Sequence, residues 1–449
     1  MMTTDPWHLG SWRTRPIRQQ PQYDDPDALD GALRQVKALP PLVHAGEVDR
    51  LREELAEASL GRRFLLQGGD CAERFVDCTA ATIENKLKIL LQMSVVLTWG
   101  ARTPVVRVAR LAGQYAKPRS NDTEVIDGRE VLSYRGDHVN GIHPDERRAD
   151  PARMVRACYH SAATLNYVRA LLAGGFADLH RPSSWDLGFV RHPRRRAEYE
   201  QMIHRITESI QFMEAAGAPY SDSLRSCELF TSHEGLLLAY EEAQTVRVGN
   251  DWYNLGAHFL WIGHRTRHLD GAHVEYFRGV KNPLGVKVGP GLEAAELVQM
   301  LDRLNPDNIP GRITLIVRLG EKGVSANLPP LIQAIRRSGR SVLWSCDPMH
   351  GNTESTSAGL KTRDFDRILS ELRQSFDLHR LYGSALGGVH FELTGDDVTE
   401  CVGGPQDLQV SDLSRSYETF CDPRLNYAQS LELAFLVAQH IGQARDGHV

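Results

Sequence analysis

Residues 341–352 read SVLWSCDPMHGN, a short apolar run that passes directly into a polar sequence. The run Ser341–Cys346 has the length of a buried strand, and amphipathic helical patterns flank it at 324–338 and 364–377. Because alternation of short apolar runs with amphipathic segments is typical of βα units, this stretch predicts one strand of a parallel sheet. The polar residues that follow it indicate that the carboxyl end of the strand carries chemistry.

Seven further runs after residue 60 have the same texture, and most of them precede a helical pattern. The runs are Arg63–Gln67, Pro104–Leu111, Cys227–Thr231, His258–Ile262, Leu284–Val288, Ile313–Leu319 and Gly388–Leu393, and the additional helices are predicted at 81–99, 151–172, 293–304 and 426–445. Eight βα units predict a (β/α)8 TIM barrel, which builds its active site at the carboxyl ends of its strands. We therefore assign residues 61–449 to one catalytic barrel.

Two segments are surplus to eight βα units. Residues 1–60 are polar, with helical patterns at 27–39 and 48–60, and form a predicted N-terminal helical extension. Residues 175–216 follow the second predicted strand and contain a helical pattern over Glu198–Ala215. We interpret this second segment as an inserted helical hairpin used for assembly or regulation, and a plain surface excursion is the alternative.

Composition excludes several classes of protein. The chain has 449 residues with 52 Lys+Arg and 57 Asp+Glu, a net charge of −5, so no bulk positive field favours a nucleic-acid partner. No apolar run reaches the roughly 18 residues that a membrane helix needs. The N-terminus lacks a secretory signal pattern, which predicts a cytoplasmic protein. Seven scattered cysteines without a CxxC pair exclude a disulfide scaffold and a zinc ribbon.

Metal-capable side chains fall at or near the carboxyl ends of predicted strands. They are Cys71, His350, Glu392 and Asp422. A thiolate, an imidazole and two carboxylates form a mixed soft and hard donor set, which suits Mn²⁺, Co²⁺, Fe²⁺ or Zn²⁺ better than Mg²⁺ or Ca²⁺. The four residues are far apart in sequence, so the spacing alone is a weak indication of a metal site.

A second group at the same strand ends is cationic. It comprises Arg110, Lys117, Arg119, Arg265, Lys287 and Arg318. Several such groups converging on one pocket would repel one another without a polyanion, so they imply a ligand with phosphate and carboxylate groups. The alternative for any single one is an ion pair with an acidic neighbour in the barrel wall.

Several long strings in this chain resemble one enzyme family. They are GGDCAE at 68–73, GQYAKPRS at 113–120, RGDHVNG at 135–141, TSHE at 231–234, DPMHGN at 347–352 and DPRLN at 422–426. These strings closely resemble the type II 3-deoxy-D-arabino-heptulosonate 7-phosphate (DAHP) synthases, and the likeness runs from about residue 7 to residue 440. The strings are rare, so they are far more specific than a lone glycine motif.

The resemblance implies an activity and a role for each matching residue. The implied reaction condenses phosphoenolpyruvate (PEP) with erythrose 4-phosphate, the first step of the shikimate pathway that leads to aromatic amino acids. The implied metal ligands are Cys71, His350, Glu392 and Asp422, with Mn²⁺ or Co²⁺ preferred over Zn²⁺ or Fe²⁺. The implied PEP-binding cations are Arg110, Arg265, Lys287 and Arg318, and Lys117 matches the lysine near the reacting centre. Arg119 and Ser120 match the residues that bind the phosphate of erythrose 4-phosphate, and Trp261 begins the fourth-strand motif.

One position departs from the family's usual pattern. His264 stands in the fourth-strand motif where family members commonly carry Glu. If the position binds the PEP phosphate through its backbone N–H, histidine is tolerable; if the carboxylate orients a catalytic water or Lys117, activity or its pH dependence should change.

Three other functions stay open at this point. The chain could be a paralogue that uses an amino-sugar analogue of erythrose 4-phosphate, a regulatory relative with weak turnover, or a zinc hydrolase, which the basic pocket disfavours. The resemblance also implies a homodimer or homotetramer, aromatic amino acids as effectors, and a chorismate mutase as a partner. We place effector binding and oligomer contacts in residues 1–60 and 175–216.

Overall fold

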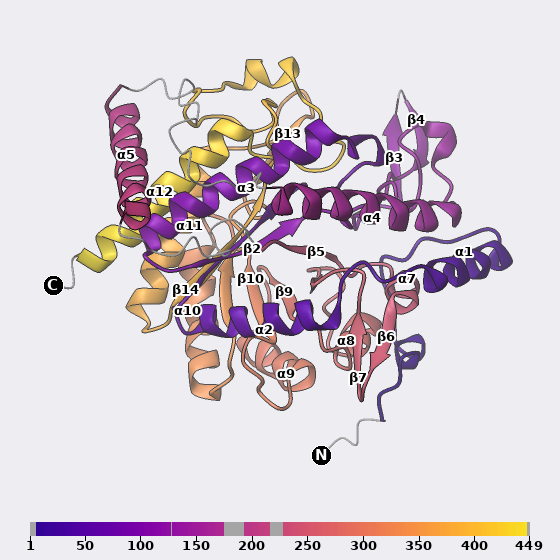
Figure 1. The fold of residues 1–449 in the computed structure, drawn as a ribbon. Helices are drawn as coiled ribbons and strands as arrows, with labels where there is room; N and C mark the ends of the chain where they lie inside the picture. Colours follow the sequence, from indigo (N-terminus) through magenta and orange to yellow (C-terminus); the bar gives the residue numbers. More distant parts are fainter. Residues whose placement is uncertain (1–5, 127, 175–192, 216–227, 447–449) are drawn as a thin grey trace.

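The computed structural model describes residues 6–126, 128–174, 193–215 and 228–446. Its centre is a barrel of parallel strands (Figure 1). The barrel strands are β1 Phe64–Gly69, β2 Val105–Arg110, β5 Phe230–Glu234, β8 Phe259–Ile262, β9 Leu284–Val288, β10 Ile313–Val317, β11 Leu343–Cys346 and β14 Leu386–Glu392. They close in the order β1-β14-β11-β10-β9-β8-β5-β2. The predicted TIM barrel is confirmed.

The third barrel strand lies further along the chain than the sequence predicts. The apolar run placed it at Cys227–Thr231, whereas β5 spans Phe230–Glu234, and Cys227 lies outside the described residues. The prediction missed the polar half of the strand because its side chains are buried with partners. Ser232 donates to the carbonyl of Ala109 at 3.0 Å, and His233 contacts the buried Glu241. Buried polar groups that are satisfied in this way leave no apolar signal in the sequence.

Helices surround the barrel on its outside. Their bounds are α3 Ala80–Ala101, α4 Ala152–Ala173, α7 Leu238–Ala243, α8 Ala272–Phe277, α9 Ala294–Leu304, α10 Val324–Ser338, α11 Phe365–Leu381 and α12 Tyr427–Asp446, with 3₁₀ turns at Ser11–Thr14, Phe75–Asp77, Pro144–Glu146 and Val410–Arg415. The six helices predicted after residue 60 outside the insertion are confirmed to within a few residues. Within the described ranges, no helix is long and apolar enough to cross a membrane.

The N-terminal extension contains both predicted helices, α1 Pro26–Ala38 and α2 Ala45–Ser59. Helix α2 closes the N-terminal end of the barrel. Its residues Leu51, Leu55 and Ala58 are completely buried and pack with interior barrel residues such as Leu65 and Phe230. The opposite end, where the strands terminate, is thereby left as the open end of the barrel.

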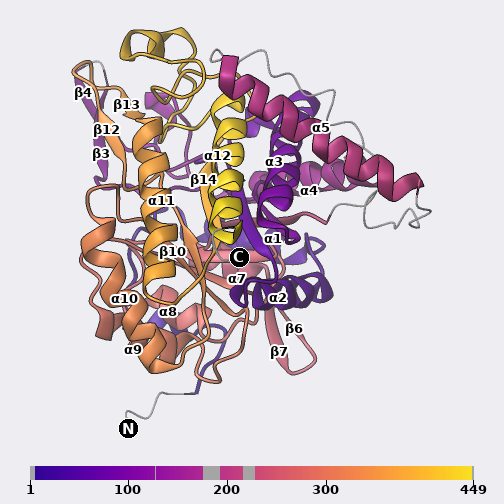
Figure 2. The same cartoon turned by 90° about the vertical axis from the view of Figure 1, so that its left-hand side faces the viewer.

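The segment between the second and third barrel strands contains one described helix, α5 Pro193–Ala215. It begins earlier than the predicted helix at Glu198, and residues 175–192 and 216 of the predicted hairpin lie outside the described residues. Both views place α5 beside α12 (Figures 1 and 2). Tyr199 stacks on Phe435 with ring centroids 4.2 Å apart. The boundaries assigned to the extension, barrel and insertion stay predictions.

Three two-stranded hairpins were not predicted. They are β3 Thr123–Ile126 with β4 Arg129–Leu132, β6 Thr245–Val248 with β7 Asp251–Asn254, and β12 Thr353–Ser355 with β13 Lys361–Arg363. Each strand has three or four residues and most of their positions are only partly buried, so their sequences lack a clear apolar alternation. Figure 2 shows β3, β4, β12 and β13 gathered at one end of the molecule. Hairpin β12–β13 follows the carboxyl end of β11 and adjoins the candidate site.

Candidate active site

A polar cavity of about 310 Å³ opens at the carboxyl ends of the barrel strands. Most of the predicted site residues line it. The lining residues are Cys71, Arg110, Gln114, Lys117, Pro118, Glu234, Trp261, Gly263, His264, Arg265, Lys287, Arg318, His350, Thr353, Lys361, Glu392 and Asp422. Arg119 and Ser120 instead line an adjoining cavity of about 290 Å³, which shares Lys117, Arg265 and Asp422 with the first.

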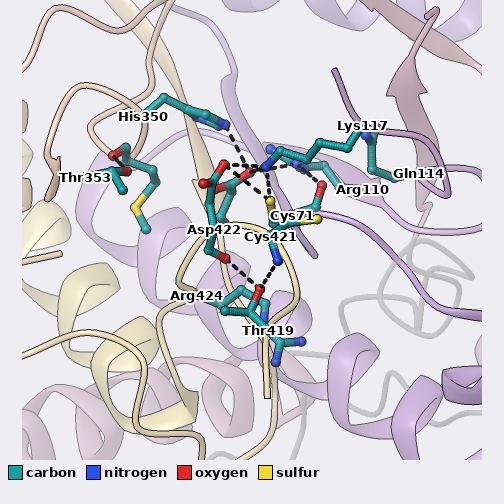
Figure 3. Close-up of polar contacts among 12 residues, drawn as sticks. Cys71, Arg110, Gln114, Lys117, His350, Thr353, Thr419, Cys421, Asp422 and Arg424 are labelled. Atoms are coloured by element: carbon teal, nitrogen blue, oxygen red, sulfur yellow. Dashed lines mark hydrogen bonds and ion pairs between the residues drawn. The ribbon is translucent and has the colours of Figure 1, made fainter. Parts of the chain in front are cut away.

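Three of the four predicted metal ligands form one cluster, and Figure 3 labels two of them, Cys71 and Asp422. One ligand atom from each of Cys71, Glu392 and Asp422 lies within 4.8 Å of the other two. His350 adjoins this cluster through Glu392, with Nε2 3.0 Å from Oε1. The fold thus brings together four residues that are separated by up to 351 positions in the chain.

The local backbone sets the direction of Cys71. Strand β1 ends at Gly69, whose φ of +143° is rarely adopted by residues with side chains, and a Cβ there would lie 2.6 Å from the carbonyl oxygen of Arg110. The close approach of β1 and β2 lets the Arg110 guanidinium donate to the carbonyl of Cys71 and to Glu392 Oε1, both at 3.0 Å. One buried arginine therefore fixes the backbone of one candidate ligand and the carboxylate of another.

His350 has the orientation that a metal ligand needs. Its Nδ1 lies 2.7 Å from Oδ2 of the buried Asp347. Burial raises the pKa of Asp347, but the lowering effect of His350 and Lys287 is larger, so the net pKa is well below its usual range. A carboxylate at Nδ1 favours the tautomer with the proton on that nitrogen, which leaves the Nε2 lone pair directed at the cluster.

The donor set fits a divalent transition cation. The ammonium of Lys117 contacts both Cys71 Sγ and Asp422 Oδ2, so the cluster already attracts a positive charge. Burial lowers the pKa of Lys117, but the carboxylate of Asp422 and the groups beside it raise the pKa well above its usual value. Thiol, imidazole and carboxylate donors together match Mn²⁺, Co²⁺, Fe²⁺ or Zn²⁺.

Two of the predicted cations, Arg110 and Lys287, lie beside the Trp261 ring and the His390 imidazole. The Arg110 guanidinium and the Lys287 ammonium lie 5.2 and 5.9 Å from the ring centroid of the buried Trp261. Both also contact His390 Nε2, at 2.8 and 2.9 Å, while Nδ1 of the same ring faces Gln67 Oε1 at 2.8 Å. The pattern makes Nε2 the acceptor for the two cations and holds them side by side.

The alternative of simple ion pairing holds for some cations and not for others. Arg110 pairs with Glu392, Lys287 with Asp347 and Arg119 with Glu124. In the described part of the chain, Arg265 and Arg318 pair with no carboxylate; they donate to Ser120 Oγ at 2.7 Å and to the His350 carbonyl at 2.6 Å. These two guanidinium groups therefore leave uncompensated positive charge in the cavity for an anionic ligand.

Comparison with known proteins decides the family. The sequence model of the "Class-II DAHP synthetase family" matches residues 7–438. The chain belongs to this family. It is 52% identical to the phospho-2-dehydro-3-deoxyheptonate aldolase of Neurospora crassa, over 98% of this chain and 95% of that protein. It is 48% identical to the phospho-2-dehydro-3-deoxyheptonate aldolase of Streptomyces coelicolor, over 97% of this chain and 98% of that protein. The family resemblance stated from the sequence is confirmed, and so is the prediction that the chain is an enzyme of this family.

A solved structure titled as a truncated 3-deoxy-D-arabino-heptulosonate 7-phosphate synthase from Thermotoga maritima has 11% sequence identity to this chain and a TM-score of 0.32. The match covers 86% of this chain and 88% of that one. The barrel assignment rests on the strand order described above.

His264 is the position at which the sequence resemblance implies a glutamate in most family members. Its ring lines the cavity, with Nδ1 3.5 Å from the Arg267 guanidinium. Burial and the positive charges of Arg267 and Arg318 lower the pKa of His264 to about 4. The imidazole is therefore neutral at neutral pH and adds no positive charge to the site.

We expect His264→Gln to keep kcat/KM within about threefold of the unaltered protein, because it exchanges one neutral polar group for another. The pH profile between 5.5 and 8 should also keep its shape, since a pKa of about 4 lies below that range. Steady-state kinetics between pH 5.5 and 8 measure both kcat/KM and the shape of its pH profile. Loss of an inflection near pH 6.5 in the variant would contradict the neutral assignment, and much faster turnover by His264→Glu would favour the regulatory relative.

Sequence reasoning missed several residues of this site. Glu234 lines the cavity and is half-buried; loss of solvent around its carboxyl raises its pKa, and its Oε1 has no hydrogen bond among the described residues. It follows His233, whose imidazole instead contacts Glu241. Lys361, on the unpredicted hairpin β12–β13, forms an ion pair with Asp422 in which Nζ lies 2.8 Å from Oδ1. Position at a strand end could have identified Glu234, but no pattern indicates Lys361.

Proposed function

We propose that this enzyme condenses PEP with erythrose 4-phosphate to give DAHP and inorganic phosphate, as the first step of the shikimate pathway. The observation that carries the proposal is a metal-capable cluster directly beside a cavity lined with cations. The names of the relatives from Neurospora crassa and Streptomyces coelicolor support it. An amino-sugar analogue of erythrose 4-phosphate stays an alternative second substrate.

The cations would overcome the repulsion between two phosphorylated substrates. Arg110, Arg265, Lys287 and Arg318 would bind the phosphate and carboxylate of PEP, with Trp261 and His264 beside them. Arg119 and Ser120, in the adjoining cavity, would bind the phosphate of erythrose 4-phosphate. Fixed positive charge at both ends aligns C3 of PEP with the aldehyde carbon and lowers the entropy cost of their encounter.

Cys71, His350, Glu392 and Asp422 would hold the divalent cation, with Mn²⁺ or Co²⁺ preferred and Zn²⁺ or Fe²⁺ as alternatives. When bound, the cation supplies Lewis-acid polarisation of the aldehyde oxygen. The protonated Lys117 would donate its proton to that oxygen as the C–C bond forms. Water would then add at C2 of PEP, and the C2–O bond to the phosphate would break, so that its electrons leave with phosphate. The water oxygen becomes the C2 carbonyl of DAHP; one of its protons replaces the proton given by Lys117, and the other leaves with phosphate.

The proposal is tested by a metal-reconstituted assay with PEP and erythrose 4-phosphate, in which DAHP and phosphate should appear in equal amounts. Addition of EDTA should abolish turnover, and Mn²⁺ or Co²⁺ should restore it. Faster turnover with an amino-sugar analogue would favour the alternative substrate. Repeating the assay with tryptophan, phenylalanine or tyrosine tests the predicted effectors, while the oligomeric state and a chorismate mutase partner stay predictions.

Lys287 predicts an alkaline limit to the activity. Burial lowers the pKa of Lys287 to about 8, against the opposing effect of Asp347. The ammonium charge is therefore present below pH 8 and is lost as the pH rises through that value. We expect kcat/KM for PEP, which reports the free enzyme, to fall above about pH 8. In Lys287→Arg the guanidinium stays charged, so the fall should move to higher pH; an unchanged profile would assign the limit to another group.

A further inference from the structure

The two carboxylate oxygens of Glu392 contact different residues. Oε1 lies 3.0 Å from both Arg110 Nη2 and His350 Nε2 and 3.9 Å from Lys117 Nζ. Oε2 is contacted by Arg363 Nη2 at 2.7 Å. Neither Oε2 nor Nη2 has a hydrogen bond in the described part of the chain, so this close contact is an ion pair without hydrogen-bond alignment.

Arg363 comes from β13, outside the barrel, and its side chain is completely buried. Besides Glu392, its guanidinium donates from Nε to Thr353 Oγ1 at 2.9 Å and from Nη1 to the carbonyl of Pro423. Pro423 is the neighbour of Asp422 in the chain. One rigid, planar group thus joins β12, the end of β14 and the loop that carries Asp422.

We propose that Arg363 is a positioning residue that sets the affinity of the metal cluster by fixing Glu392 and the Asp422 loop relative to each other. This inference rests on the metal site of the proposed function. A buried guanidinium at Oε2 balances the carboxylate charge and leaves Oε1 beside His350. Loss of such an outer partner typically weakens metal binding by about 10- to 100-fold.

Arg363→Lys and Arg363→Met test the proposal through cobalt binding to metal-free protein. The thiolate-to-cobalt absorption band follows occupancy through Cys71 without any need for turnover. We expect both variants to bind Co²⁺ about 10- to 100-fold more weakly. Arg363→Lys keeps the charge but loses the planar fork, and it preserves the test if Arg363→Met fails to fold. Arg367→Met is the matched control, because Arg367 pairs with Glu354 at the surface next to the same hairpin and should leave the affinity unchanged.

A double-mutant cycle separates positioning from general damage to the fold. If Arg363 acts through Glu392, then Arg363→Lys should weaken cobalt binding much less in a Glu392→Gln background than in the unaltered protein. Equal effects in both backgrounds, or affinities of both Arg363 variants within twofold of the unaltered protein, would overturn the inference. Failure of the unaltered protein to bind Co²⁺ would overturn the proposed metal site and this inference with it.

Discussion

Replacement of Cys71 by alanine is expected to abolish both metal binding and turnover. Cys71 is 1% exposed and supplies the sulfur donor of the cluster with Glu392 and Asp422. Burial raises the pKa of its thiol well above the usual value, as does the adjacent negative charge of Glu392, so the thiolate needs a cation to form. Loss of the Lewis acid removes several kcal/mol of transition-state stabilisation, which corresponds to a fall in kcat of at least about 10³-fold.

Cobalt titration and steady-state kinetics on the same preparation check this expectation. The absorption band of a cobalt thiolate should disappear in Cys71→Ala even at high Co²⁺ concentrations. Cys158→Ala is the matched control, since Cys158 is a buried thiol that packs beside Leu42 and Leu165, away from the cavity. If Cys71→Ala kept the band, another cysteine would be the ligand; if it kept turnover, the aldehyde would not need the cluster.

The barrel was predictable because its strands carry a strong local signal. The run Leu284–Val288 is buried throughout and coincides with β9. Buried parallel strands are apolar on both faces, so each appears as a short continuous run in the sequence. The signal failed at β5, where Ser232 and His233 occupy buried positions and are satisfied by hydrogen bonds that only the fold supplies.

The site was predictable to the extent that it follows the strand ends. His350 and Lys287 lie on or directly after barrel strands, so the TIM-barrel rule places them at one face without knowledge of the structure. Arg363 has no such signal, because it lies on a three-residue strand of a hairpin and reaches Glu392 from outside the barrel. Its contact depends on loop geometry, which local periodicity does not encode.

Replacement of Lys117 by methionine should lower kcat by about 10²- to 10⁴-fold, the usual contribution of a positioned general acid. Unlike Cys71→Ala, this replacement should not weaken metal binding. The Lys117 ammonium now contacts Cys71 and Asp422, and it lies 3.9 Å from Glu392. Because this positive charge competes with a cation for the same three ligand groups, its removal should leave cobalt affinity unchanged or increase it.

A split between turnover and metal affinity therefore distinguishes the proton donor from the metal ligands. Lys117→Arg should also be slow, because a guanidinium keeps the charge but does not release a proton at neutral pH. Lys361→Met is the matched comparison: Lys361 also pairs with Asp422, at 2.8 Å, but its side chain is 46% exposed, so its loss should cost no more than about fivefold. If Lys117→Met kept kcat within tenfold, the proton would have to come from water, and Lys117 would serve only to balance the charge of the ligand cluster.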